Sequence, residues 1–161
     1  MLHKKYLAPT RICMGVAIFL CAMVGAAGGV GYASEIRKAF ASPDIADLPY
    51  SAAVQAGNTI YVSGVLGLEH GGQALVPGGV TAETEKIFDR ISEVLERAGS
   101  SIEQVVKCTV LLADIDDFAE MNAVFAATFP QNAPARSTII VPAIPVGAAV
   151  EIECNALVHL E

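Results

Sequence analysis

The hydrophobic positions of the chain follow two periods, and each period predicts a different kind of element. Two β-prone runs, residues 51–56 and 59–66, flank a Gly-Asn pair, which predicts a β-hairpin. Residues 81–98 carry an apolar stripe at helical spacing, which predicts an amphipathic helix that ends at Gly99. The residues of this stripe are Ile87, Ile91, Val94, Leu95 and Ala98.

The second half of the chain predicts three further strands and a second helix. Residues 105–112, 137–141 and 148–158 are β-prone runs, and apolar and polar positions alternate clearly in the last of them. After the first of these strands, a capping box at residues 117–120 predicts a helix that runs to about Phe129.

The order β-β-α-β-α-β-β, on a chain this short, predicts an α+β fold. We expect a single mixed sheet with two helices packed on one of its faces. The other face still carries apolar residues, so we expect the chain to bury it by self-association.

The first 33 residues have a different pattern, which predicts an export segment. A basic start without acids precedes residues 12–31, which carry no charge, and the run ends in small residues at 31 and 33. This pattern is typical of a secretory signal peptide, and a retained membrane anchor is the alternative. It predicts export, into the periplasm in a bacterium. We interpret residues 34–44 as a polar lead-in and residues 45–161 as the folded domain.

Composition excludes one class of protein, and charge argues against another. The chain has 161 residues, of which 53% are hydrophobic and 17% charged, so it is not intrinsically disordered. Its 10 basic and 17 acidic residues give a net charge of −7. Removal of residues 1–33 would take away three basic and no acidic residues, which leaves −10. Such a charge opposes binding to nucleic acid.

Cysteines and histidines give little indication of a metal site. Cys108 and Cys154 both lie in predicted strands, where a lone cysteine commonly acts as a small hydrophobic residue; a disulfide between them remains open. His70 lies beside two glycines and His159 is near the end of the chain, and neither has a partner at ligand spacing.

The candidate chemistry lies in the last third of the chain. Arg136 is the only lysine or arginine after Lys107, so it either holds a ligand carboxylate or forms a structural ion pair with Glu151 or Glu153. These two acids share one face of the last strand, where they either orient a water or face solvent. Asn122 falls on the apolar face of the second helix, as a structural amide or a site residue.

Four blocks of the sequence resemble a known family, among them ALVPGGVTAETEKIFDRISEVLERAGSS and VVKCTVLLADIDDFAEMNAVFAATFP. The block PARSTIIVPAIPVGAAVEIECNAL, together with LPYSAAVQAGNTIYVSGVLGL nearer the start, resembles the signature of the Rid/YjgF family of reactive-intermediate deaminases. The resemblance extends over about residues 45–161. It implies a chorismate-mutase-like α+β domain that assembles as a trimer, with active sites between subunits.

The resemblance also implies an activity and a set of site residues. Family members hydrolyse 2-imino acids, such as 2-iminobutanoate or 2-iminopropanoate, or their enamine tautomers, to 2-keto acids and ammonia without a metal or an organic cofactor. By position in the motifs, Arg136 would clamp the substrate carboxylate and Glu151 would position the water. The residues that would line the pocket are Tyr50, Ser63, Gly64, Asn122 and Thr138, the last in place of a cysteine often found there.

Two alternatives remain at this point. The chain could be a non-catalytic trimer that binds small carboxylates or other proteins. Some relatives are labelled ribonucleases, an activity that the acidic composition opposes.

Overall fold

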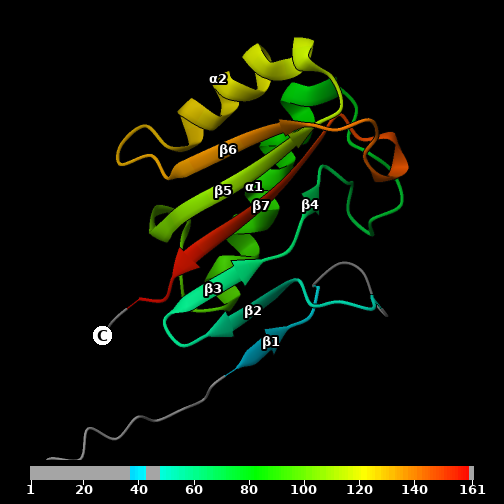
Figure 1. Cartoon of the computed structure of the whole chain (residues 1–161). Helices are drawn as coiled ribbons and strands as arrows, with labels where there is room; N and C mark the ends of the chain where they lie inside the picture. The colour runs from blue at the N-terminus through cyan, green and yellow to red at the C-terminus, as the bar shows by residue number, and fades with distance from the viewer. Residues whose placement is uncertain (1–36, 43–47, 160–161) are drawn as a thin grey trace, which may run out of the picture. The chain divides into compact units, whose positions relative to one another are not determined.

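The structure is a computed structural model that describes residues 37–42 and 48–159 (Figure 1). The predicted export segment and the two ends of the predicted lead-in, residues 34–36 and 43–44, lie outside these residues. Within the described ranges, no helix is both long enough and apolar enough to cross a membrane.

In the described part of the chain, seven strands form one mixed sheet in the order β1-β2-β3-β7-β5-β6, and β4 pairs with β7 (Figure 1). Every pair is antiparallel except β5 with β6, which are parallel because helix α2 connects them. The strands are β1 Lys38–Phe40, β2 Ala53–Ala56, β3 Thr59–Val62, β4 Val65–Leu66, β5 Val105–Leu112, β6 Ala135–Ile140 and β7 Val150–Leu157.

Helices α1, Gly79–Arg97, and α2, Phe118–Thr128, cover one face of the sheet, as the sequence predicted. The apolar stripe of α1 is buried against the sheet, and Gly99 follows the helix with φ +79°, a conformation that glycine adopts without strain. The two helices meet through three aromatic rings in edge or tilted contacts. These rings belong to Phe88, Phe125 and Phe129.

The start of α2 differs from the prediction. Asp117 makes no side-chain capping bond, because a short 3₁₀ turn, Ile115–Asp117, precedes the helix and places Asp117 itself in a helical conformation. An N-cap residue needs an extended backbone, and here that residue is Asp114. Its carboxylate accepts a hydrogen bond of 3.0 Å from the N–H of Asp116.

The predicted strand 59–66 is divided into β3 and β4. Tyr61 pairs with Asn155 of β7, whereas Val65 pairs with Ile152, so one extra residue lies between the two pairs. An extra residue in one strand is a bulge, which bends the strand and re-aims the side chains beside it. Ser63 and Gly64 form this break.

A strand that the sequence did not predict lies in the segment interpreted as a lead-in. β1 pairs with β2 through the register of Phe40 with Ala53, and the Phe40 side chain is buried. Three residues with one apolar position are too few to show a period, so the pattern gave no signal for this strand.

The two described cysteines are joined in a disulfide. Cys108 of β5 and Cys154 of β7 lie directly opposite each other, with Cα atoms 4.1 Å apart. The sequence left this bond open and favoured two unpaired thiols. It predicted both strands, but it could not show that their register places the two cysteines face to face.

Candidate functional site

Arg136 lies between the edge strand β6 and helix α2. Its in-register neighbour is Cys108, whose side chain belongs to the core beneath the helices, so Arg136 also points to the helix-covered face. Its guanidinium donates a hydrogen bond of 2.8 Å to the Asn122 side-chain oxygen. The guanidinium carbon lies 4.5 Å from the centre of the Phe125 ring and 5.7 Å from that of Phe118.

These contacts hold the positive charge without neutralising it. Within the described ranges, no carboxylate forms an ion pair with Arg136. The predicted alternative, a structural pair with Glu151 or Glu153, is therefore absent. A guanidinium has five N–H donors, and one bond to an amide leaves donors for an anion. The partner of Asn122 also explains why an amide is tolerated on an otherwise apolar helix face.

Glu151 lies on the opposite face of the sheet, in β7. Its in-register neighbours are Leu66 of β4 and Leu111 of β5. Its carboxylate carbon would be 2.9 Å from a Cβ atom at Gly64, and the carboxylate oxygen would overlap that atom. The bulge thus needs glycine at this position, because any side chain would displace the carboxylate.

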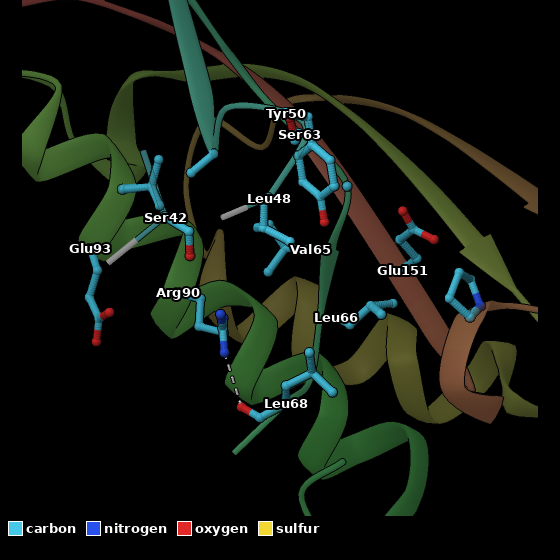
Figure 2. A pocket seen from close by; sticks show the side chains of 14 residues that line it. Ser42, Leu48, Tyr50, Ser63, Val65, Leu66, Leu68, Arg90, Glu93 and Glu151 are labelled. Atoms are coloured by element: carbon cyan, nitrogen blue, oxygen red, sulfur yellow. Dashed lines mark hydrogen bonds between the residues drawn. The ribbon is translucent and has the colours of Figure 1, made fainter. Parts of the chain in front are cut away.

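A cavity of about 170 Å³ opens beside Glu151 (Figure 2). Tyr50, Ser63 and Gly64 line it together with Glu151, so the structure brings together four of the seven predicted site residues. The Ser63 hydroxyl donates a hydrogen bond of 2.8 Å to the Ser51 carbonyl, which fixes the chain at the break after β3.

The environment of Glu151 raises the pKa of its carboxyl group above the ordinary value. Burial is the main cause, because it disfavours the charged form, and the negative charge of Glu153 adds to it. Both acids also line a second hollow of about 150 Å³ with Thr109 and Leu111 on the open face of the sheet. A carboxyl group whose pKa is raised holds a transferred proton more readily than an ordinary carboxyl group and can return it later in the reaction.

The predicted site therefore forms two clusters within one chain. The arginine cluster is Arg136 with Asn122 and Thr138, all from β6 and α2. The glutamate cluster is Glu151 with Tyr50, Ser63 and Gly64. Because side chains of a strand alternate between faces, the register places the two clusters on opposite faces of the sheet, and Arg136 lines neither cavity that Glu151 lines.

One buried acid near the site was missed by sequence reasoning. Glu83 of α1 is 5% exposed, and its carboxylate accepts a hydrogen bond of 2.9 Å from the N–H of Ala149, two residues before Glu151. A Cβ at Gly67 would lie 2.5 Å from the Glu83 Cα, so the chain after β4 packs directly on the helix backbone. The available signal was spacing, since Glu83 stands four residues before Ile87 on the apolar stripe.

No metal centre is formed by the part of the chain that the structure describes. There, no group of three or more histidine, cysteine, aspartate or glutamate side chains lies close enough together to hold an ion.

One family model and several curated proteins match most of this chain. The family model described as Endoribonuclease L-PSP matches residues 41–158. The 2-iminobutanoate/2-iminopropanoate deaminase of Bos taurus is 47% identical over 109 residues, which cover 68% of this chain and 80% of that protein. RutC family protein UK114 of Drosophila melanogaster is 42% identical over 124 residues, 76% of this chain and 90% of that protein.

A solved structure has the same fold. The crystal structure of the yeast protein YEO7 superposes with a TM-score of 0.72 at 34% sequence identity, over 76% of this chain and 99% of that one.

Proposed function

The chain belongs to the Endoribonuclease L-PSP family, also called Rid/YjgF, and from this premise we propose that it is an imine deaminase. Its substrates would be reactive 2-imino acids or their enamine tautomers, and its products 2-keto acids and ammonia. The observation that carries the proposal is Arg136, whose charge is held by an amide and two rings and has no carboxylate partner among the described residues. The names of the curated relatives support the same chemistry.

The two clusters supply what imine hydrolysis needs. A protonated imine carbon is already electrophilic, so the protein has to orient the substrate and one water rather than provide a nucleophile. Arg136 would hold the substrate carboxylate through two parallel hydrogen bonds. Glu151 would accept a proton as the water oxygen bonds to the imine carbon, which gives a carbinolamine. Glu151 would then return that proton to the nitrogen and take the proton of the carbinolamine hydroxyl as the C–N bond breaks, so that ammonia leaves and the keto group forms.

Since the clusters lie on opposite faces of one chain, we propose that two copies build each site. The arginine cluster of one copy would meet the glutamate cluster of another, in the trimer that the family resemblance implies. The open face of the sheet supports self-association because it exposes large apolar side chains; Tyr61 is 49% and Ile139 48% exposed. Repeated contacts of this kind, closed by a threefold axis, would give three equivalent sites.

We further propose that the chain works outside the cytoplasm. The pattern of residues 1–33 supports export, with residues 12–31 as an anchor if the segment is retained. The disulfide between Cys108 and Cys154 supports an oxidising compartment, since such bonds are rare where thiols are kept reduced.

Ribonuclease activity, which the family description names, is the second candidate. A net charge of −7 opposes it because a polyanion is attracted to basic surfaces. Cleavage of RNA that survives purification and is abolished by Arg136→Gln would favour this candidate over the first.

A coupled assay tests the proposed function. An amino-acid oxidase generates the imine, and the assay follows the release of the keto acid. We expect the wild type to accelerate hydrolysis above the spontaneous rate and Glu151→Gln to lose most of that acceleration. Glu96→Gln is the matched control, since it makes the same change at an exposed acid of α1 that lines neither cavity beside Glu151. A wild type that adds nothing to the spontaneous rate contradicts the proposal.

A further inference from the structure

The cavity beside Glu151 has mainly apolar walls. It lies between the segment before β2, the strand β4 and one side of α1 (Figure 2), and Gly64 and Glu151 belong to its lining. The apolar side chains that line it include Tyr50, Ala52, Val65, Leu66, Leu68 and Val94.

The wall also carries the polar side chains of Ser42, Ser63, Arg90 and Glu93. The Ser63 hydroxyl donates to the Ser51 carbonyl, and the Arg90 guanidinium donates a hydrogen bond of 3.2 Å to the Leu68 carbonyl, as Figure 2 shows for Arg90. The part of the wall formed by Tyr50, Ala52, Val65 and Leu66 carries no charge, so an uncharged apolar group matches it better than a second carboxylate or an ammonium group does.

The size of the cavity indicates how large this apolar group is. An apolar cavity of about 150 Å³ holds a benzene ring. The cavity here is about 170 Å³, so it takes a branched aliphatic or a phenyl side chain. A methyl or ethyl group, as in the two substrates named for the relatives, would leave most of it unfilled.

The position of the cavity relative to Glu151 connects it with the substrate. The imine carbon of the substrate has to lie within reach of the water that Glu151 holds. The carboxylate of the substrate would point toward the Arg136 guanidinium. The side chain is the third substituent of that carbon, and the cavity opens next to the Glu151 carboxylate. We propose that the cavity is a side-chain subsite and that the preferred substrates are 2-imino acids with branched aliphatic or aromatic side chains. This inference rests on the proposed function.

Rates on a series of imines test the proposal. The imines are generated from alanine, leucine and phenylalanine by the same oxidase, and kcat/KM is measured for the wild type with each. Burial of one methylene favours binding by about fourfold, so we expect the leucine-derived imine to exceed the alanine-derived one by at least about tenfold. Equal values, or a preference for the alanine-derived imine, overturn the subsite and leave the proposed function standing. No acceleration with any imine overturns both.

Two variants test whether this cavity causes the preference. Ala52→Leu puts a larger side chain into the cavity, and we expect it to lower the leucine-to-alanine ratio of kcat/KM by about tenfold or more. Ala126→Leu is the matched control, because it makes the same change at an exposed position of α2 outside the cavity; its ratio should equal that of the wild type. An unchanged ratio in folded Ala52→Leu contradicts the proposal.

Leu68→Ala provides a second variant in case Ala52→Leu does not fold. It enlarges the cavity, so the phenylalanine-derived imine should gain relative to the leucine-derived one. Calorimetry adds a binding measurement without turnover: 4-methyl-2-oxopentanoate should bind the wild type more tightly than pyruvate. Equal affinities for these two keto acids overturn the subsite.

Discussion

The arginine cluster and the glutamate cluster are built in different ways, and the difference shows how this fold divides its chemistry. Arg136 is held by direct contacts with its neighbours, namely a hydrogen bond to Asn122 and the faces of two phenylalanine rings. Glu151 makes no side-chain hydrogen bond within the described residues, and its place depends on the room left by Gly64. One side chain is positioned by contacts, whereas the other is positioned by a missing Cβ.

The two ways of positioning a side chain affect substrate binding and proton exchange differently. A permanently charged group that is already positioned can anchor a carboxylate with little reorganisation. A carboxyl group that is half-buried and only loosely held can exchange a proton and a water, at the cost of a raised pKa. Changes in the arginine cluster should therefore abolish substrate binding, and changes around Glu151 should separate activity from stability.

The largest effect should follow from removal of the guanidinium. Arg136→Gln should lower kcat/KM by about 10²–10³-fold, because an anchor that makes charged hydrogen bonds is lost. Arg136→Lys should recover only part of this loss, since an ammonium group keeps the charge but not the paired donors. Arg97→Gln, at an exposed position of α1, should leave the rate unchanged. Rates within threefold of the wild type for Arg136→Gln would show that this side chain is not the anchor.

Loss of the disulfide should have the next largest effect. It joins β5, the neighbour of the arginine strand, to β7, the glutamate strand, and closes a loop with a sequence separation of 46. The variant with Cys108→Ala and Cys154→Ala should lose about 2–4 kcal/mol of unfolding free energy in a denaturant titration. Reductant should destabilise the wild type and have no effect on the double variant; equal stability of all samples would refute the cross-link.

Substitution of the two glycines that flank β4, Gly64 and Gly67, should affect different properties: the first should lower activity and the second stability. In Gly64→Ala the new methyl group meets the mobile end of Glu151, which can turn away, so we expect about tenfold lower activity with a nearly unchanged melting temperature. In Gly67→Ala the methyl group meets the backbone of Glu83 in α1. This backbone cannot move aside, so we expect a loss of about 1–3 kcal/mol in the free energy of unfolding. The reverse pattern would show that Gly64 does not serve to place the carboxylate.

A double-mutant cycle checks the same point. If Gly64→Ala acts only through Glu151, the variant carrying both Gly64→Ala and Glu151→Gln should be no slower than Glu151→Gln alone. Additive losses would mean that Gly64 has a second role.

The smallest effect should be a dependence of stability on pH. The pKa of Glu151 is raised in the folded chain, so its ionisation opposes folding: the stability present below the ordinary pKa is lost as the pH rises through the folded value. Glu151→Gln should thus melt slightly above the wild type at pH 8 and together with it at pH 4. Thermal unfolding at the two pH values measures this difference, with Glu96→Gln, an exposed acid of α1, as the comparison. A lower melting temperature for Glu151→Gln at pH 8 would contradict the assigned environment.

The sequence predicted those parts of the fold that local pattern determines. The apolar stripe of α1 and the strand 105–112 appear as expected, because the spacing of apolar residues within each segment determines which of its faces is buried. The register between distant strands does not follow from the pattern of any one segment. It decides that Cys108 faces Cys154, that β3 and β4 are separated by a bulge, and that Arg136 and Glu151 face opposite ways.

The candidate site shows the same limit. The family motifs named Arg136, Glu151 and their pocket residues and implied a site between subunits, but they did not show that the register places the two groups on opposite faces of one chain. Buried Glu83 and the apolar cavity beside Glu151 depend on how α1 packs on β4, which no single segment encodes.

Complementation between two inactive variants tests the central claim, that each site combines the arginine cluster of one copy with the glutamate cluster of another. Arg136→Gln and Glu151→Gln are unfolded together, refolded as a mixture and assayed against each variant refolded alone. If two copies share each site, random assembly of equal amounts restores about a quarter of the wild-type rate. A mixture no faster than the mean of the two separate variants would contradict the account, because it would mean that one chain holds both groups of its own site.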